Sequence, residues 1–111
     1  MILTCQGKVD MLGLKQDLKE TTKLTRHLVA SKEPHLRTIF LEKDSLPARI
    51  IKNSGCFVLN FSDGKESSCE KLDCFRLEGA SLECEVHSIQ ELGDSIQITG
   101  LVVHEGTTIS T

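Results

Sequence analysis

Aromatic residues are scarce in this sequence. It contains no tryptophan, no tyrosine and only 4 phenylalanines among 111 residues. Proteins that bind single-stranded nucleic acid stack successive bases on aromatic side chains, and this chain offers few. Its formal net charge of −3 also lacks the lysine and arginine excess of a nucleic-acid surface. We therefore expect no nucleic-acid partner.

Long apolar runs are absent as well. No apolar stretch approaches the roughly 18 residues that a membrane-spanning helix needs. The first residues, MILTC, lack the charged and apolar regions of a signal peptide. We expect no membrane partner and a cytoplasmic location. The 39% hydrophobic and 26% charged residues suit one globular domain over residues 1–111.

The number of cysteines is odd. They occupy positions 5, 56, 69, 74 and 84, and an odd set without a signal peptide does not indicate a disulfide framework. Cys69 and Cys74 are close in sequence, but no second close pair accompanies them, as a zinc site requires. We expect no metal and interpret the thiols as small hydrophobic side chains. The alternative is a zinc or redox-switch protein, which requires bound metal or a Cys69–Cys74 disulfide.

The first half of the chain predicts two helices and a strand. Segment 14–29, LKQDLKETTKLTRHLV, predicts a helix, because one helical face would carry Leu14, Leu18, Thr25, Leu28 and Val29. Residues 36–42, LRTIFLE, are typical of a strand. Over 45–54 a short helix is predicted, because Ser45 is a natural N-cap and Gly55 suits the position after the last turn.

The second half predicts antiparallel strands. Residues 56–61, CFVLNF, form an apolar strand, and segment 62–76 is polar and irregular. In 80–87 the alternation predicts a strand with Leu82 and Cys84 inside and Ser81, Glu83, Glu85 and His87 in solvent.

Glycines mark the turns of the predicted sheet. Gly93-Asp94 makes a turn, after which residues 96–103 return as a strand. Gly100 inside that strand indicates a bulge, a barrel corner or a close backbone approach. Another hairpin is expected around Gln6-Gly7. Short antiparallel strands with one or two helices favour an α+β domain built on a small barrel.

The start of the helix at Ser45 is the best candidate for a binding site. The first N–H groups of a helix lack partners and carry partial positive charge, so they attract phosphate. Lys43 and Arg49 add positive charge, Ser45 adds a hydroxyl, and Asp44 is the local anion. The more common alternative is an ordinary serine-capped helix that binds nothing.

Catalytic motifs are missing from the sequence. It has no G-x-S-x-G nucleophile turn and no phosphate-binding P-loop. The catalytic residues are therefore unknown. Any redox chemistry would come from a bound cofactor.

Two blocks of sequence resemble the flavin reductase-like family, which has the FMN-binding split-barrel fold. The block PHLRTIFLEKDSLPARIIKNSGCFVLNF (34–61) contains a Pro-led strand, a short helix ending in Ser54-Gly55 and a strand of the F-V-x-N type. The block LEGASLECEVHSIQELGDSIQITGLVVHE (77–105) contains the Gly-Ala, Glu-Cys-x-Val and Gly-Asp features of the family, followed by the last strand. The blocks occur in the family's order.

The resemblance implies a mainly β, α+β fold: a small antiparallel split β-barrel with one or two short helices. It also implies a homodimer that holds FMN near the subunit interface. With NAD(P)H as co-substrate, such a protein would be a flavin reductase-like oxidoreductase that transfers hydride through its flavin. Lys43, Asp44 and Ser45 would face the FMN phosphate, with Ser31 and Thr38 as further cofactor-binding candidates. The alternative is a degenerate split-barrel binding or assembly module without flavin or catalytic activity.

Overall fold

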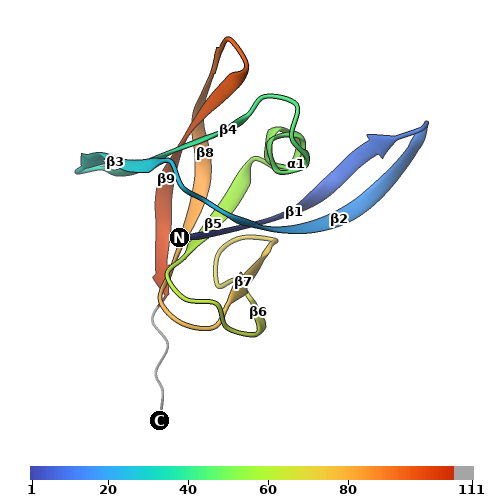
Figure 1. The fold of residues 1–111 in the computed structure, drawn as a ribbon. Helices are drawn as coiled ribbons and strands as arrows, with labels where there is room; N and C mark the ends of the chain where they lie inside the picture. The colour runs from blue at the N-terminus through green and yellow to red at the C-terminus, as the bar shows by residue number, and fades with distance from the viewer. Residues whose placement is uncertain (107–111) are drawn as a thin grey trace.

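Antiparallel strands dominate the computed structural model, which describes residues 1–106 (Figure 1). The end of the domain predicted over 1–111, residues 107–111, lies outside the described residues. In chain order the elements are β1 (Ile2–Met11), β2 (Leu14–Lys23), β3 (His27–Lys32), β4 (His35–Glu42), α1 (Leu46–Ser54), β5 (Cys56–Asn60), β6 (Glu66–Ser68), β7 (Phe75–Leu77), β8 (Ser81–Leu92) and β9 (Ser95–Gly106).

Seven of these strands form one sheet in the order β2-β1-β5-β8-β9-β4-β3, and β6 and β7 form a separate hairpin. Every strand pair is antiparallel. Within residues 1–106 the edge strands β2 and β3 do not pair with each other, so the sheet does not close into a complete barrel. The predicted fold class, a mainly β split barrel with a short helix, is confirmed in this open form.

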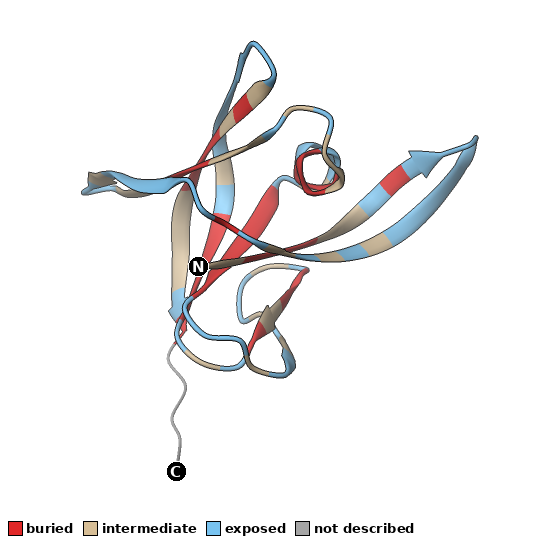
Figure 2. Ribbon diagram, in the orientation of Figure 1, coloured by how far each residue is buried: buried red, intermediate tan, exposed pale blue. Residues whose placement is uncertain are grey.

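The main core lies between α1 and the sheet. Ile50 and Ile51 of α1 are fully buried in one cluster with Leu3, Phe57 and Ile98 from three strands. Figure 2 shows the buried residues gathered on α1 and the central strands. Burying each such side chain stabilises the fold by about 1.5–3 kcal/mol. This apolar contact fixes α1, and therefore both of its ends, against the sheet.

The helix predicted over residues 14–29 is wrong. The chain forms β2 there and begins β3 at His27. Leu14 and Leu18 share a face in a strand as well as in a helix, because a spacing of four is even. β2 pairs with β1 along its whole length, which satisfies the backbone without a helix. Tertiary pairing has therefore overridden the local periodicity.

The hairpin expected around Gln6-Gly7 is also wrong, because β1 runs straight through these residues. The chain turns instead at Leu12-Gly13, where φ is 54° and 81°. Positive φ at both central residues defines the type I′ turn that suits the twist of a two-residue hairpin. Gly7 has another role: a Cβ there would lie 2.8 Å from Cβ of Ser54, so glycine lets α1 approach β1.

Gly100 marks a close approach between β9 and β5, one of the outcomes expected from a glycine inside a strand. A Cβ at Gly100 would lie 2.6 Å from the ring of Phe57, so no other residue fits without a shift. The β8–β9 ladder also changes register between Val86, which pairs with Gly100, and Ser88, which pairs with Thr99. The sheet is thus bulged where the largest core side chain enters.

Segment 62–76 was expected to be irregular, but it contains the β6–β7 hairpin. This hairpin packs against β1 and β5 and covers the second face of the central strands. The strand predicted over 80–87 is confirmed as part of β8, but its solvent face is not. Ser81 and Glu83 were expected in solvent and are buried, because the hairpin and its loop lie over them.

Glu83 holds the loop between β6 and β7. Its carboxylate is fully buried and accepts three backbone N–H groups: Oε2 from Glu70 at 2.9 Å, and Oε1 from Lys71 at 2.8 Å and Leu72 at 3.2 Å. A buried carboxylate is tolerated only when its oxygens are satisfied in this way. The loop backbone therefore supplies the donors that water would otherwise supply.

We expect Glu83→Gln to lower the free energy of unfolding by about 1–3 kcal/mol, because the amide NH2 would face the N–H of Glu70 and leave donors unpaired. Urea unfolding followed by circular dichroism measures this. Glu85→Gln is the matched control, since Glu85 is exposed two residues along the same strand. A loss no larger for Glu83→Gln than for Glu85→Gln would show that the carboxylate does not hold the loop.

Candidate functional site

One pocket lies where β4 ends, α1 begins and β8 turns into β9. It has a volume of about 750 Å³, within the range of ligand sites. Its lining includes Lys43, Asp44 and Ser45 together with the turn Gly93–Ser95. Three of the residues predicted to bind a cofactor are therefore side by side in one concave surface.

The backbone fixes the two walls of this pocket relative to each other. β4 pairs with β9 up to the pair Glu42 and Ser95. Just beyond it, the N–H of Lys43 donates to the carbonyl of Asp94 at 2.9 Å. Gly93 has a φ of 62°, a left-handed conformation that allows the tight β8–β9 turn. The turn is thus attached to the residues that lead into α1.

Ser45 caps α1, as the sequence predicted. Its backbone is extended, and its hydroxyl accepts the N–H of Ala48 at 3.4 Å and donates to the carbonyl of Glu42 at 2.7 Å. Pro47 has no N–H to offer. The N–H of Leu46 also lies at the start of the helix, but Leu46 is not part of the pocket lining.

Charges of both signs surround the pocket. Nζ of Lys43 lies 3.5 Å from Oε2 of Glu91, and Nζ of Lys52 lies 3.1 Å from Oε1 of the same carboxylate. Lys52 and then Lys43 hold the pKa of the Glu91 carboxyl below its ordinary value. On the opposite wall, the guanidinium of Arg26 lies 5.1 Å from the ring centroid of Phe40, an arrangement that stabilises a cation over an aromatic face.

The pocket fits a phosphate only at its cationic side. Lys43 is a suitable donor near the helix start, where the partial charge of the helix is positive. Glu42, Asp44 and Asp94 line the same space, so the lining carries one more carboxylate than cations. An anion bound here must lie beside Lys43 and away from these carboxylates.

Two other predicted residues do not line this pocket. Thr38 is buried on β4, where its hydroxyl lies 2.8 Å from that of Thr99 on β9. Ser31 lies on β3, at the point where the β3–β4 ladder changes register. The hydroxyl of Thr38 is occupied by a cross-strand hydrogen bond and serves the sheet.

A second pocket, of about 680 Å³, opens at the other end of α1. It is lined by residues of β1, the end of α1, the start of β5, β8 and the loop before β7, among them Lys8, Asn53, Cys56, Lys71 and Glu85. Sequence reasoning missed it, because these segments are far apart in the chain and carry no shared motif. One local feature of the sequence relates to this pocket: Gly7, whose missing side chain lets the end of α1 pack closely on β1.

Most cysteines are buried, as interpreted from the sequence. Cys5 and Cys84 are fully buried, and burial raises the pKa of each thiol to about 12. Such thiols stay protonated and unreactive near neutral pH. Among residues 1–106, no three histidine, cysteine, aspartate or glutamate side chains are arranged to hold a metal ion. Nor does any helix in these residues have the length and apolar character to cross a membrane.

Solved structures share this fold. The NADH:FAD oxidoreductase SgcE6 of Streptomyces globisporus C-1027, in complex with NAD and FAD fragments, matches with a TM-score of 0.74 at 16% identity, over 96% of this chain and 73% of that one. The styrene monooxygenase flavin reductase of Pseudomonas putida S12 gives 0.68 at 16% identity, over 96% and 77%. The FMN-binding protein of Thermus thermophilus gives 0.70 at 13% identity, over 95% and 71%. The flavin reductase-like fold implied by the two sequence blocks is confirmed.

Comparisons at the level of sequence give no such match. No protein-family model matches the chain, and no curated protein matches it. At the low identities of the structural matches, the shared property is the fold. The cofactor and the reaction must therefore be argued from the pocket.

We expect Ser45→Ala to lower the free energy of unfolding by about 1 kcal/mol, because α1 loses its N-cap. Ser45→Asp should restore most of this stability, since aspartate is an equally good cap and adds a negative charge at the helix start. Urea titrations of the two variants and the parent chain measure the difference. Equal midpoints for Ser45→Ala and the parent would contradict the capping role.

Proposed function

We propose that this chain is an FMN-binding flavoprotein of the flavin reductase type, an enzyme that uses NAD(P)H as electron donor. The observation that carries the proposal is the pocket at the start of α1. It joins Lys43, Asp44 and Ser45 of one family-like sequence block to the Gly-Asp turn of the other, on a fold shared with flavin reductases. These blocks are distant in sequence and meet only in the folded chain.

The residues of the pocket would bind and orient the cofactor. Lys43 would hold the phosphate near the start of the helix, and the backbone turn at Gly93–Ser95 would border the bound cofactor. The half-buried ring of Phe40 offers apolar surface to a flat ring system. The bound flavin would supply the redox chemistry itself.

A second candidate function is a split-barrel binding or assembly module without flavin. It is favoured by the excess of carboxylates around the pocket and by the use of the Ser45 hydroxyl within the cap. Both features weaken the attraction for a phosphate. The two functions differ in whether the purified protein binds added FMN.

We also propose a homodimer in the cytoplasm. The β1–β2 hairpin reaches away from the rest of the fold (Figure 1) and carries Leu12 and Leu14 fully or largely exposed at its tip. Exposed clusters of large apolar side chains are typical of protein contacts. The five free cysteines fit a reducing compartment.

We expect Lys43→Gln to weaken FMN binding about tenfold, the loss that follows from removing one charged hydrogen bond of about 1.4 kcal/mol. Quenching of FMN fluorescence on titration with protein measures the affinity. Lys52→Gln is the matched control: it removes the other lysine of Glu91 but lies outside the pocket lining.

Three outcomes decide between the candidate functions. Quenching by the parent chain and loss in Lys43→Gln alone support a flavin phosphate at this site. Equal losses in both lysine variants would place the phosphate elsewhere. No quenching by the parent chain would support the module without flavin.

We expect the parent chain to sediment as a dimer and Leu12→Lys/Leu14→Lys to shift it toward the monomer, because charged side chains at the hairpin tip oppose burial there. Sedimentation velocity at several protein concentrations measures this. Lys15→Glu, an exposed change on the same hairpin, is the control. A parent chain that stays monomeric at every concentration would contradict the dimer.

A further inference from the structure

Three of the five cysteines gather beside the β6–β7 hairpin. Cys56 and Cys74 are buried in a small core with Phe75, and Cys69 packs against that core. Cys56 begins β5, Cys69 follows β6, and Cys74 precedes β7. Separate parts of the chain thus bring three thiols into one cluster.

Cys69 and Cys74 lie directly opposite each other. The β6–β7 ladder pairs Ser68 with Phe75, and Cys69 and Cys74 are the next position in the same register. The N–H of Cys69 donates to the carbonyl of Cys74 at 3.3 Å. Opposite residues of a hydrogen-bonded antiparallel pair have Cα atoms about 5.5 Å apart and side chains on the same face. That separation falls within the range that a disulfide bridges.

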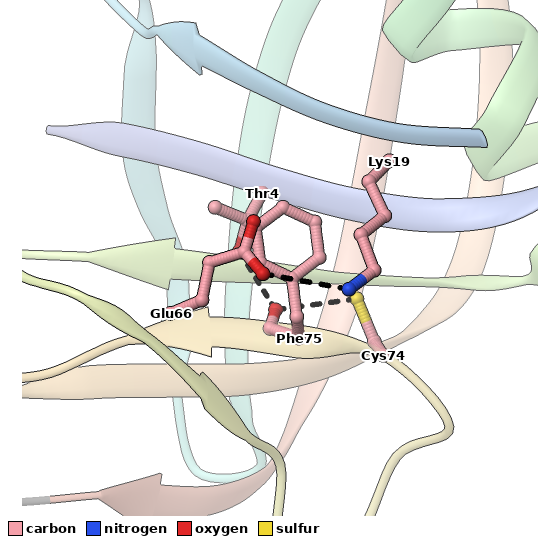
Figure 3. A network of polar contacts seen from close by, with 5 residues as sticks. All are labelled: Thr4, Lys19, Glu66, Cys74 and Phe75. Atoms are coloured by element: carbon pink, nitrogen blue, oxygen red, sulfur yellow. Dashed lines mark hydrogen bonds and ion pairs between the residues drawn. The ribbon is translucent and has the colours of Figure 1, made fainter.

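The surroundings hold Cys74 in place. Figure 3 shows its sulfur directed at the carbonyl of Phe75, to which it donates at 3.4 Å, and the hydroxyl of Thr4 donates to the same carbonyl at 3.0 Å. The ion pair of Lys19 with Glu66, at 3.4 Å, joins β2 to β6 beside them. On the other side, Glu83 fixes the loop that connects the two cysteines.

The thiols differ in reactivity. The neighbouring Cys74 thiol and burial raise the pKa of Cys56 well above its ordinary value. Cys56 lowers the pKa of Cys74, but Cys69 and burial oppose it, and the resulting pKa is about 12. Cys69 is half-buried, whereas the other four cysteines are buried. Cys69 is therefore the accessible thiol and Cys74 its buried neighbour.

Small molecules can reach the cluster. Cys74 lines a pocket of about 360 Å³ that also contains Lys19 and Asp73. Cys56 lines the larger pocket at the end of α1. A small disulfide thus has access to the side of the hairpin on which Cys74 lies.

We propose that Cys69 and Cys74 form a reversible intramolecular disulfide by exchange with a small-molecule disulfide of the glutathione type. The Cys69 sulfur, as thiolate, attacks one sulfur of the small disulfide, and the other leaves as a thiol after taking up a proton. The Cys74 thiol gives its proton to solvent, and its sulfur attacks the Cys69 sulfur of the mixed disulfide. The second small sulfur leaves as a thiolate and takes up a proton from solvent. Two protein thiols are oxidised while one small disulfide is reduced to two thiols. The proposal does not depend on flavin binding.

Cys69 is the partner that the geometry assigns to Cys74. Cys56 is also a neighbour of Cys74, but it starts a different strand, which pairs with β8. Only the Cys69–Cys74 pair among the five cysteines combines a cross-strand position with a half-buried member. The bond would close the loop whose residues Lys71–Asp73 border the pocket at the end of α1.

Peptide mapping of the full chain tests the proposal. The reduced protein is incubated with glutathione disulfide, remaining thiols are alkylated, and the intact mass is measured. We expect the loss of two hydrogen atoms and, after alkylation in denaturant, three alkylated cysteines in place of five. Trypsin cleaves after Lys65, Lys71 and Arg76, so Cys69 and Cys74 fall in different peptides, 66–71 and 72–76. The disulfide should join these two peptides, and dithiothreitol should release them.

Two single-residue variants test which cysteine bonds to Cys74. Cys69→Ser should lose the cross-link and keep at most a mixed disulfide with glutathione, whereas Cys56→Ser should still form the cross-link. If Cys56→Ser fails to fold, the map of the parent chain decides. A cross-link between 72–76 and the Cys56 peptide 53–65, a cross-link between two chains, or no loss of hydrogen would overturn the proposal.

Discussion

A buried carboxylate with three backbone donors is the constraint on which one whole side of this molecule depends. Glu83 could not lie inside the protein unless the loop Glu70–Leu72 turned its N–H groups inward. Once the loop does so, the β6–β7 hairpin is held over the central strands. β5 and the start of β8 are then buried on both faces, and the core divides into the main cluster around Phe57 and the small one around Phe75.

Asn60 completes this arrangement from the other strand. Its side chain accepts the N–H of Leu77 at 2.9 Å and donates to the carbonyl of Ile2 at 3.1 Å and the hydroxyl of Thr4 at 3.0 Å. The asparagine that ends the F-V-x-N pattern therefore ties the hairpin to β1. A satisfied network of this kind specifies one arrangement of the strands more sharply than apolar contact does.

The parts that could be predicted from the sequence depend on local chemistry. A serine cap and a glycine after the last helical turn act within a few residues, and a glycine inside a strand indicates a close approach whichever side chain makes it. Ser45, Gly55 and Gly100 were therefore interpreted correctly. Two predictions were wrong: Glu83 on the solvent face of its strand, and a helix over 14–29. Both outcomes depend on which distant segments pack against these residues. No residue of 14–29 encodes its pairing with β1, and no feature of 62–76 announces a hairpin that buries a charge. The second pocket escaped prediction for the same reason.

The two larger pockets lie at opposite ends of α1, and Cys56 of the thiol cluster lines the second of them. The helix has nine residues, about 13 Å at the rise of an α-helix, and its buried isoleucines hold it rigidly to the sheet. The pocket at its start takes its walls from β4 and the β8–β9 turn, whereas the thiol cluster belongs to β5 and the β6–β7 hairpin. Anion binding would depend on Lys43 and the start of the helix, whereas disulfide exchange would depend on the cross-strand position of Cys69 and Cys74. The pocket at the start of α1 and the thiol cluster share the same fold but no side chain. Either chemistry can therefore be present without the other.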